Sequence, residues 1–179
     1  MSLDAIRNSI EGARRYLSEH PEEGRSPDRA AVAVLEGGLR CRVEGPEGTS
    51  IVTDMPVAVG GAGSAPTPGW LSRAALASCD ATVIAMRAAE LGIELERLEV
   101  TAESESDSRG LLGVDDSVPA GPLSSTVRVR IAARGVPEER LRELVAWTER
   151  HSPVGDLIRR SVVQRVEVEV ESVETEVGQ

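Results

Sequence analysis

Residues 70–91 read WLSRAALASCDATVIAMRAAEL, and this stretch carries the strongest fold signal in the chain. Ala, Leu, Val, Ile and Met recur on nearly every side of a helix wound at about 3.6 residues per turn. That distribution is typical of a helix enclosed by other structure rather than of one on a surface. Gly92 follows as a natural helix end, and the Gly/Pro-rich residues 54–69 precede the helix as a loop. We therefore expect a long, buried central helix that carries Cys79.

Short strands are predicted on both sides of this helix, because apolar and polar residues alternate there with a period of two. The expected strands are residues 31–36, 39–44, 49–53, 98–103, 127–131 and 166–171. Apolar residues at three and four spacing predict an amphipathic helix at 3–19, and further helices are expected at 137–148 and 152–160. Strands that group before and after a central helix, without βαβ alternation, indicate an α+β fold with a largely antiparallel sheet.

The length of 179 residues fits one domain with a small extra arm. We expect an N-terminal helical arm and linker at 1–29, the domain at 30–172 and an acidic tail at 173–179. The net charge of −10, with Arg interleaved among Glu and Asp, argues against a nucleic-acid surface.

No apolar run approaches the length that spans a bilayer, and residues 1–17 lack a signal-peptide pattern. Cys41 and Cys79 do not form a secreted disulfide framework, so a cytoplasmic location is predicted. His20 and His151 are scattered away from the cysteines and are expected to be surface groups. We predict no metal and no cofactor.

Two segments resemble the OsmC/Ohr (osmotically induced protein C / organic hydroperoxide resistance) family. Residues 66–79, PTPGWLSRAALASC, are similar to the family's loop and cysteine-bearing helix, and residues 150–154, RHSPV, are similar to its Cys-Pro-Val segment. The resemblance covers about residues 30–172. It implies an OsmC-like fold, an intertwined homodimer and reduction of hydroperoxides by a pair of cysteines that an Arg and a Glu assist.

The resemblance places the attacking cysteine at Cys79 and the second cysteine at Ser152. Serine cannot form a disulfide, so the usual resolving step is impossible between these positions. The helper Glu is missing near Gly69 and Trp70, and the helper Arg could be Arg40 or Arg42.

Each of these residues also has a structural interpretation. Cys79 can be a small buried side chain, and a reactive thiolate needs a positive or dipolar environment that Asp80 does not supply. Cys41 shares one face of a strand with Leu39 and Val43. It is expected either to pack in the core or to act as a substitute resolving thiol. Ser152, which precedes Pro153, is expected to be a helix N-cap. The Gly60–Gly69 loop lacks a phosphate-binding motif, so it is interpreted as a loop that leads into the helix.

Three functions remain open. The first is a divergent peroxidase in which Cys79 alone reacts and an external thiol reduces it. The second is a non-catalytic protein that binds a small apolar ligand, and the third is an interaction protein whose N-terminal helix docks on a partner. Retention of Cys79 favours the first, with a hydroperoxide as substrate and a homodimer as the assembly.

Overall fold

The computed structural model describes residues 2–160 and 162–171. In chain order its main elements are α1 (Leu3–Glu19), β1 (Val32–Gly37), β2 (Arg40–Glu44), β3 (Ser50–Thr53), α2 (Pro68–Glu90), β4 (Leu95–Glu105), α3 (Ser108–Leu111), β5 (Ser124–Ala133), α4 (Glu138–His151) and α5 (Pro153–Arg159). The α+β class expected from the sequence is confirmed.

The long helix α2 begins and ends where its sequence allows. The Thr67 hydroxyl accepts a hydrogen bond from the Trp70 amide at 3.1 Å, and Pro68 occupies the first helical turn, where its missing N–H costs nothing. Gly92 ends the helix with a φ of +70°, a conformation that residues with a Cβ rarely adopt.

The strands form two antiparallel sheets rather than the single sheet expected. β1, β2 and β3 make a meander in which Cys41 of β2 lies opposite Leu35 and Thr53. β4 and β5 make a long two-stranded ribbon whose cross-strand partners include Glu99 and Arg130, with Arg130 Nη1 2.9 Å from Glu99 Oε1. Such opposite-charge pairs on the exposed face help to fix the register.

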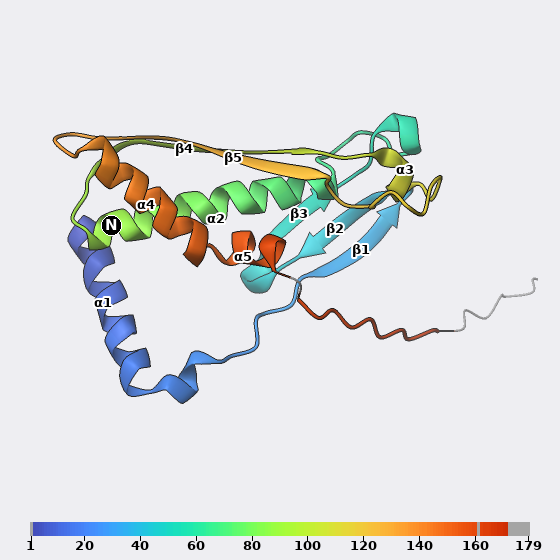
Figure 1. Cartoon of the computed structure of the whole chain (residues 1–179). Helices are drawn as coiled ribbons and strands as arrows, with labels where there is room; N and C mark the ends of the chain where they lie inside the picture. Colours follow the sequence, from blue (N-terminus) through green and yellow to red (C-terminus); the bar gives the residue numbers. More distant parts are fainter. Residues whose placement is uncertain (1, 161, 172–179) are drawn as a thin grey trace, which may run out of the picture.

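The core lies where α2 and α4 pack beside the β4–β5 ribbon (Figure 1). Its buried residues are Ile84, Ala88, Ile93, Leu141 and Leu144. They come from α2, the turn after it and α4, and partly buried Val and Leu side chains of β4 and β5 cover them. The small Ala residues of α2 allow close approach of these elements.

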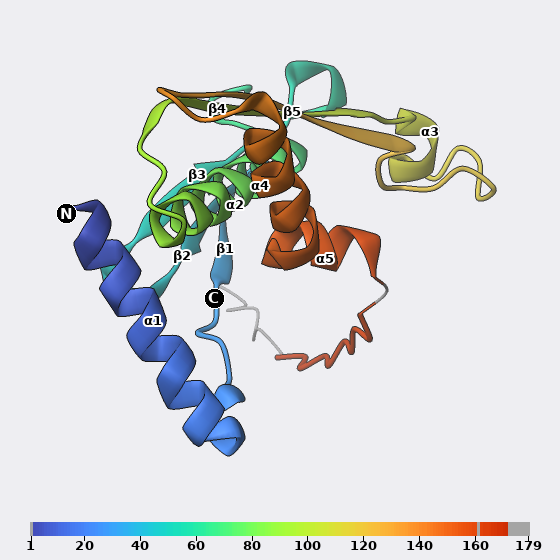
Figure 2. The same ribbon diagram turned by 60° about the vertical axis from the view of Figure 1, so that its left-hand side comes forward.

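The N-terminal helix docks on its own chain. Figure 2 shows α1 crossing the end of α2, and Arg7 Nε donates a hydrogen bond to the Ala89 carbonyl at 3.0 Å. Arg14 Nη1 lies 2.7 Å from Glu90 Oε1, close enough for an ion pair although the angle is not that of a hydrogen bond. Tyr16 and Leu17, farther along α1, are exposed.

One expectation about this fold is wrong. Residues 162–171 form no strand, and Val166, Val168 and Val170 are 77–87% exposed in a segment that runs away from the helices (Figure 1). The central helix is buried on one side and open on the other within one chain: Trp70 and Met86 are exposed at 49% and 42%. The expected acidic tail at 173–179 lies outside the described residues.

Candidate functional site

The structure brings together the two residues that the sequence singled out. Cys79 lies in the middle of α2, and Ser152 lies at the junction of α4 and α5. The Ser152 Oγ is 3.4 Å from the Cys79 Sγ, within hydrogen-bonding distance for sulfur. Ser152 is 1% exposed and Cys79 is half-buried, so Cys79 is the more accessible residue of the pair.

The position of Ser152 follows from helix capping. Its hydroxyl oxygen accepts a hydrogen bond from the Gly155 amide at 3.1 Å, so Ser152 is the N-cap of α5, as the sequence predicted. A Cβ at Gly155 would lie 3.1 Å from the Ser152 Oγ, which is a tight contact. Pro153 occupies the first turn of α5 without losing a hydrogen bond.

This geometry gives the hydroxyl two roles. Its oxygen accepts from the N-terminal turn of α5, and its O–H donates to the sulfur of Cys79. A hydrogen bond of this kind is stronger when its acceptor carries a negative charge. The pair can therefore support a nucleophilic sulfur but cannot store two oxidising equivalents as a disulfide.

The second cysteine belongs to a different element. Cys41 is half-buried in β2, and both Cys41 and Cys79 are free thiols. Its neighbours across the sheet are Leu35 and Thr53. This placement agrees with a packing role on the sheet.

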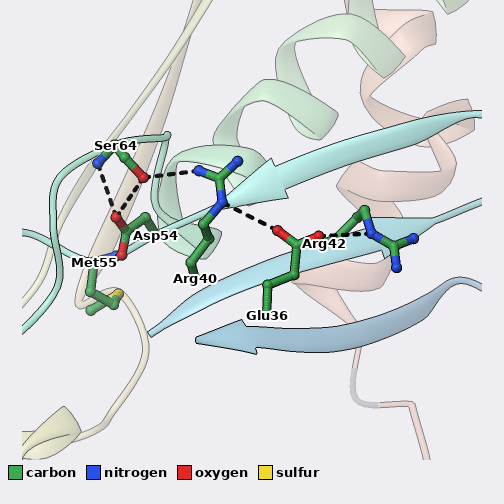
Figure 3. Close-up of polar contacts among 6 residues, drawn as sticks. All are labelled: Glu36, Arg40, Arg42, Asp54, Met55 and Ser64. Carbon is green, nitrogen blue, oxygen red and sulfur yellow. Dashed lines mark hydrogen bonds and ion pairs between the residues drawn. The ribbon is translucent and has the colours of Figure 1, made fainter. Parts of the chain in front are cut away.

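The arginines considered as helpers belong to a polar network on the three-stranded sheet (Figure 3). Arg40 donates to Glu36 at 3.2 Å and to the Ser64 hydroxyl at 2.9 Å, and Arg42 donates to Glu36 at 2.9 Å. Arg42 also pairs with Glu44. In the described part of the chain these guanidinium groups bind carboxylates and Ser64.

The network ends on Asp54, which the sequence analysis missed. Asp54 is 1% exposed, and its carboxylate accepts from the Met55 amide at 2.7 Å, the Ser64 amide at 2.9 Å and the Ser64 hydroxyl at 2.8 Å. The amide and then the hydroxyl of Ser64 hold the pKa of Asp54 below its usual range, against the opposing effect of burial. The signal in the sequence that could have identified Asp54 is its place between a strand and a Gly-rich loop.

The histidines lie away from the Cys79–Ser152 pair. The His151 ring stacks on Trp147 at a centroid distance of 3.8 Å, and its Nδ1 is 2.8 Å from the Trp147 carbonyl. His20, Glu22 and Glu23 form the one group of three possible metal ligands within residues 2–160 and 162–171, and the two glutamates are exposed. Among the helices of those same ranges, none is long and apolar enough to cross a membrane.

Comparison with known proteins identifies the fold. A structure of the organic hydroperoxide resistance protein OsmC from Legionella pneumophila matches with a TM-score of 0.56 and 25% identity, covering 75% of this chain and 91% of that one. An OsmC-like protein of unknown function from Vibrio cholerae matches with a TM-score of 0.61 and 13% identity, covering 73% and 93%. An organic hydroperoxide resistance protein from Elizabethkingia anophelis matches with a TM-score of 0.57 and 19% identity, covering 76% and 91%.

None of the curated proteins compared with the sequence matches it. The family of OsmC-like proteins matches residues 61–176, which include α2, Cys79 and Ser152. The match covers well over half of the chain, and the arrangement of elements agrees with the solved structures. The chain therefore belongs to the family of OsmC-like proteins.

Proposed function

We propose that the chain is a thiol-dependent hydroperoxide reductase that works through the single cysteine Cys79. The observation that carries this proposal is the 3.4 Å contact between the Cys79 sulfur and the Ser152 hydroxyl. A half-buried thiol beside a fixed hydrogen-bond donor is what a nucleophilic sulfur needs. The name of the Legionella pneumophila relative, an organic hydroperoxide resistance protein, supports an organic hydroperoxide as the substrate.

The first step is attack by the Cys79 thiolate on the terminal oxygen of R–O–O–H. The S–O bond forms as the O–O bond breaks, the alkoxide takes up a proton to leave as R–OH, and Cys79 becomes a sulfenic acid. Ser152 donates its hydrogen bond to the sulfur before attack.

The second step replaces the missing resolving cysteine with an external thiol. One thiol attacks the sulfenic sulfur and releases water, which leaves a mixed disulfide on Cys79. A second thiol attacks that disulfide, restores the Cys79 thiol and departs as the oxidised small-molecule disulfide. An external reductant of this kind implies a reducing compartment, and we place the protein in the cytoplasm.

We further propose that the protein works as a homodimer. The open face of α2 carries small and apolar residues, namely Ala75, Ser78, Thr82, Ala85 and Met86. A second copy that covers this face would remove it from water. A strand of that copy could also bring Arg40 or Arg42 to Cys79 and supply the positive charge that favours a thiolate.

The test is consumption of cumene hydroperoxide with dithiothreitol by the wild type, Cys79→Ser and Cys41→Ser. We expect turnover in the wild type and in Cys41→Ser, and none above buffer in Cys79→Ser. Ser152→Ala should lower the rate about tenfold, since it removes one hydrogen bond to a charged sulfur.

Other results would point elsewhere. Activity lost in both cysteine variants would make Cys41 the resolving thiol. If all variants consume hydroperoxide no faster than buffer alone does, the peroxidase proposal is wrong and the non-catalytic binding protein is favoured.

A further inference from the structure

The corner that carries Ser152 is held by its backbone. The Ser152 N–H donates to the Thr148 carbonyl at 2.9 Å, and the Ser152 carbonyl accepts from the Asp156 amide at 2.8 Å, so the hydrogen bonding of α4 passes directly into that of α5. Ser152 is buried, and a Cβ at Gly155 would lie 3.1 Å from its Oγ, which leaves the hydroxyl little room. The place of this hydroxyl therefore follows the place of the last turn of α4.

Trp147 lies in that last turn and has two partners. The His151 ring stacks on the Trp147 ring at a centroid distance of 3.8 Å, with 5° between the planes. The guanidinium carbon of Arg87, in α2, lies 4.9 Å from the centroid of the Trp147 ring, within the range of a cation–π interaction. Trp147 therefore joins the end of α4 to α2.

Arg87 is itself fixed on α2. Its Nη1 donates to Glu90 Oε2 at 3.0 Å, and the side chains of Arg87 and Glu90 are only 26% and 7% exposed. A guanidinium that is partly removed from water binds an aromatic face more strongly than one that is fully solvated. The Arg87–Trp147 contact is thus one between two side chains that other groups already hold in place.

The same two helices make this contact and the Cys79–Ser152 contact. Arg87 follows Cys79 in α2, whereas Trp147 precedes Ser152 in α4, so the two helices run in opposite directions past each other (Figure 1). The eight residues from Cys79 to Arg87 span about 12 Å of helix. A change in the Arg87–Trp147 contact would therefore move the end of α4 against α2, and with it Ser152 against Cys79.

We propose that Trp147 and Arg87 are positioning residues for the Cys79–Ser152 pair. Their contact sets the separation between the Cys79 sulfur and the side chain at position 152, and both residues act through the α4–α5 corner. The importance of this separation for catalysis rests on the proposed reductase function, but the separation itself is measurable without a hydroperoxide. Failure of the one is thus distinguishable from failure of the other.

The test measures how strongly thiols at positions 79 and 152 favour joining. The parent protein is the full chain with Ser152→Cys and Cys41→Ser, which leaves two thiols, and it is equilibrated with reduced and oxidised glutathione. As the protein pair becomes a disulfide, one glutathione disulfide is reduced to two glutathione thiols. The equilibrium constant is therefore an effective concentration of one protein thiol at the other, and mass spectrometry after acid quenching measures it.

We expect Trp147→Leu and Arg87→Met each to lower this effective concentration about tenfold, the fold-change that loss of one cation–π contact supplies. Trp147→Phe keeps a ring for the guanidinium and should stay within about threefold of the parent. The double variant should fall no further than either single variant, because the two side chains act through one contact. Arg140→Met is the matched control: Arg140 lines the same cavity of about 320 Å³ but pairs with Glu143, and its loss should change the value less than about threefold.

A role in stability alone would give a different pattern. Ile93→Val removes one carbon from the buried core and should lower the Tm without changing the effective concentration. Equal losses in Ile93→Val and Trp147→Leu, additive losses in the double variant, or a Trp147→Phe protein as poor as Trp147→Leu would each overturn the proposal. So would a parent that forms no disulfide. If Trp147→Leu does not fold, Arg87→Met decides alone, and an unchanged value there would overturn the proposal.

Discussion

Ser152 uses one hydroxyl group to cap α5 and to contact the sulfur of Cys79. A cysteine in this place would put a second sulfur close to the first, where α5 directs its N-terminal amides. We predict that Ser152→Cys forms a disulfide with Cys79 after one equivalent of hydrogen peroxide, because a sulfenic acid at Cys79 would meet a thiol at contact distance. Intact-mass spectrometry without reductant should show a loss of two hydrogens.

The control for this prediction is Ser152→Cys combined with Cys79→Ser, which keeps the new thiol but removes its partner. It should show no intramolecular disulfide. If Ser152→Cys alone stays fully reduced, the side chains do not approach each other as described.

Asp54 supports the loop before α2 through three hydrogen bonds from Met55 and Ser64. We predict that Asp54→Asn lowers the Tm by about 3–6 °C, because an amide is a weaker acceptor and its NH2 group faces donors. The pKa of Asp54 is lowered in the folded chain, so its ionised form stabilises the fold. That contribution is complete above the unfolded pKa of about 4 and is lost as the pH falls through the folded value.

Thermal unfolding of the wild type and Asp54→Asn between pH 3 and pH 7 measures this effect. The difference in Tm should be largest near neutral pH and should shrink below about pH 4. Asp116→Asn, at an exposed position, should follow the wild type throughout. A difference that stays constant down to pH 3 would rule out the charge of Asp54 as its source.

The residues of the site were predictable only where a local pattern marks them. Cys79 stands out as the thiol of an apolar helix, and Ser152-Pro153 has the form of a helix start. Asp54 carries only a weak mark, its place between a strand and a Gly-rich loop, because its importance comes from its contacts with Ser64, ten residues farther on. Contacts between distant parts of a chain leave little trace in a single sequence.

At the scale of elements, α1 is held by polar contacts at the end of α2. Glu90 has a side chain that is 7% exposed and lies within ion-pair distance of Arg14 and Arg87. We predict that Arg14→Gln lowers the free energy of unfolding by about 1 kcal/mol, near the upper end for a pair with one exposed member. A double-mutant cycle with Glu90→Gln, measured by urea denaturation, should give a coupling of about 0.5–1 kcal/mol.

Arg15→Gln, an exposed position on the same helix, is the matched control and should change the stability by less than about 0.5 kcal/mol. A coupling of zero in the Arg14–Glu90 cycle would mean that this ion pair does not help to hold α1 against α2.

Alternation of apolar and polar residues predicted β2, β4 and β5, but it was wrong for residues 162–171. The Val/Glu alternation there is as regular as in the true strands. Alternation shows that a segment can form a strand with one buried face. It does not show that the same chain offers a free sheet edge with which that strand can pair. The strands that formed have a partner close in sequence or next to them in the fold, whereas 162–171 leaves the body of the chain (Figure 1).

At the scale of the whole molecule, the described part of the chain exposes many large apolar side chains. The open face of α2 includes Met86, and β1 leaves Val32, Val34 and Leu35 exposed at 43–64%. Exposed apolar surface marks an interaction site where it is contiguous. The apolar residues on nearly all sides of residues 70–91 predicted a long buried helix; part of that burial is absent in one chain and is available to a second copy.

The last prediction is therefore the oligomeric state. We expect multi-angle light scattering at micromolar concentration to give twice the chain mass of 19.0 kDa, because a second copy on the open face of α2 buries Met86 and its neighbours. Met86→Glu places a charge in that contact and should shift the protein to monomer, since an unpaired charge at the centre of an interface is strongly unfavourable. Arg134→Glu, at the 89% exposed Arg134 side chain, is the matched control and should leave the dimer intact. A monomer mass for the wild type would show that the apolar face of α2 is covered by something other than a second copy, and a dimeric Met86→Glu would place the interface on another surface.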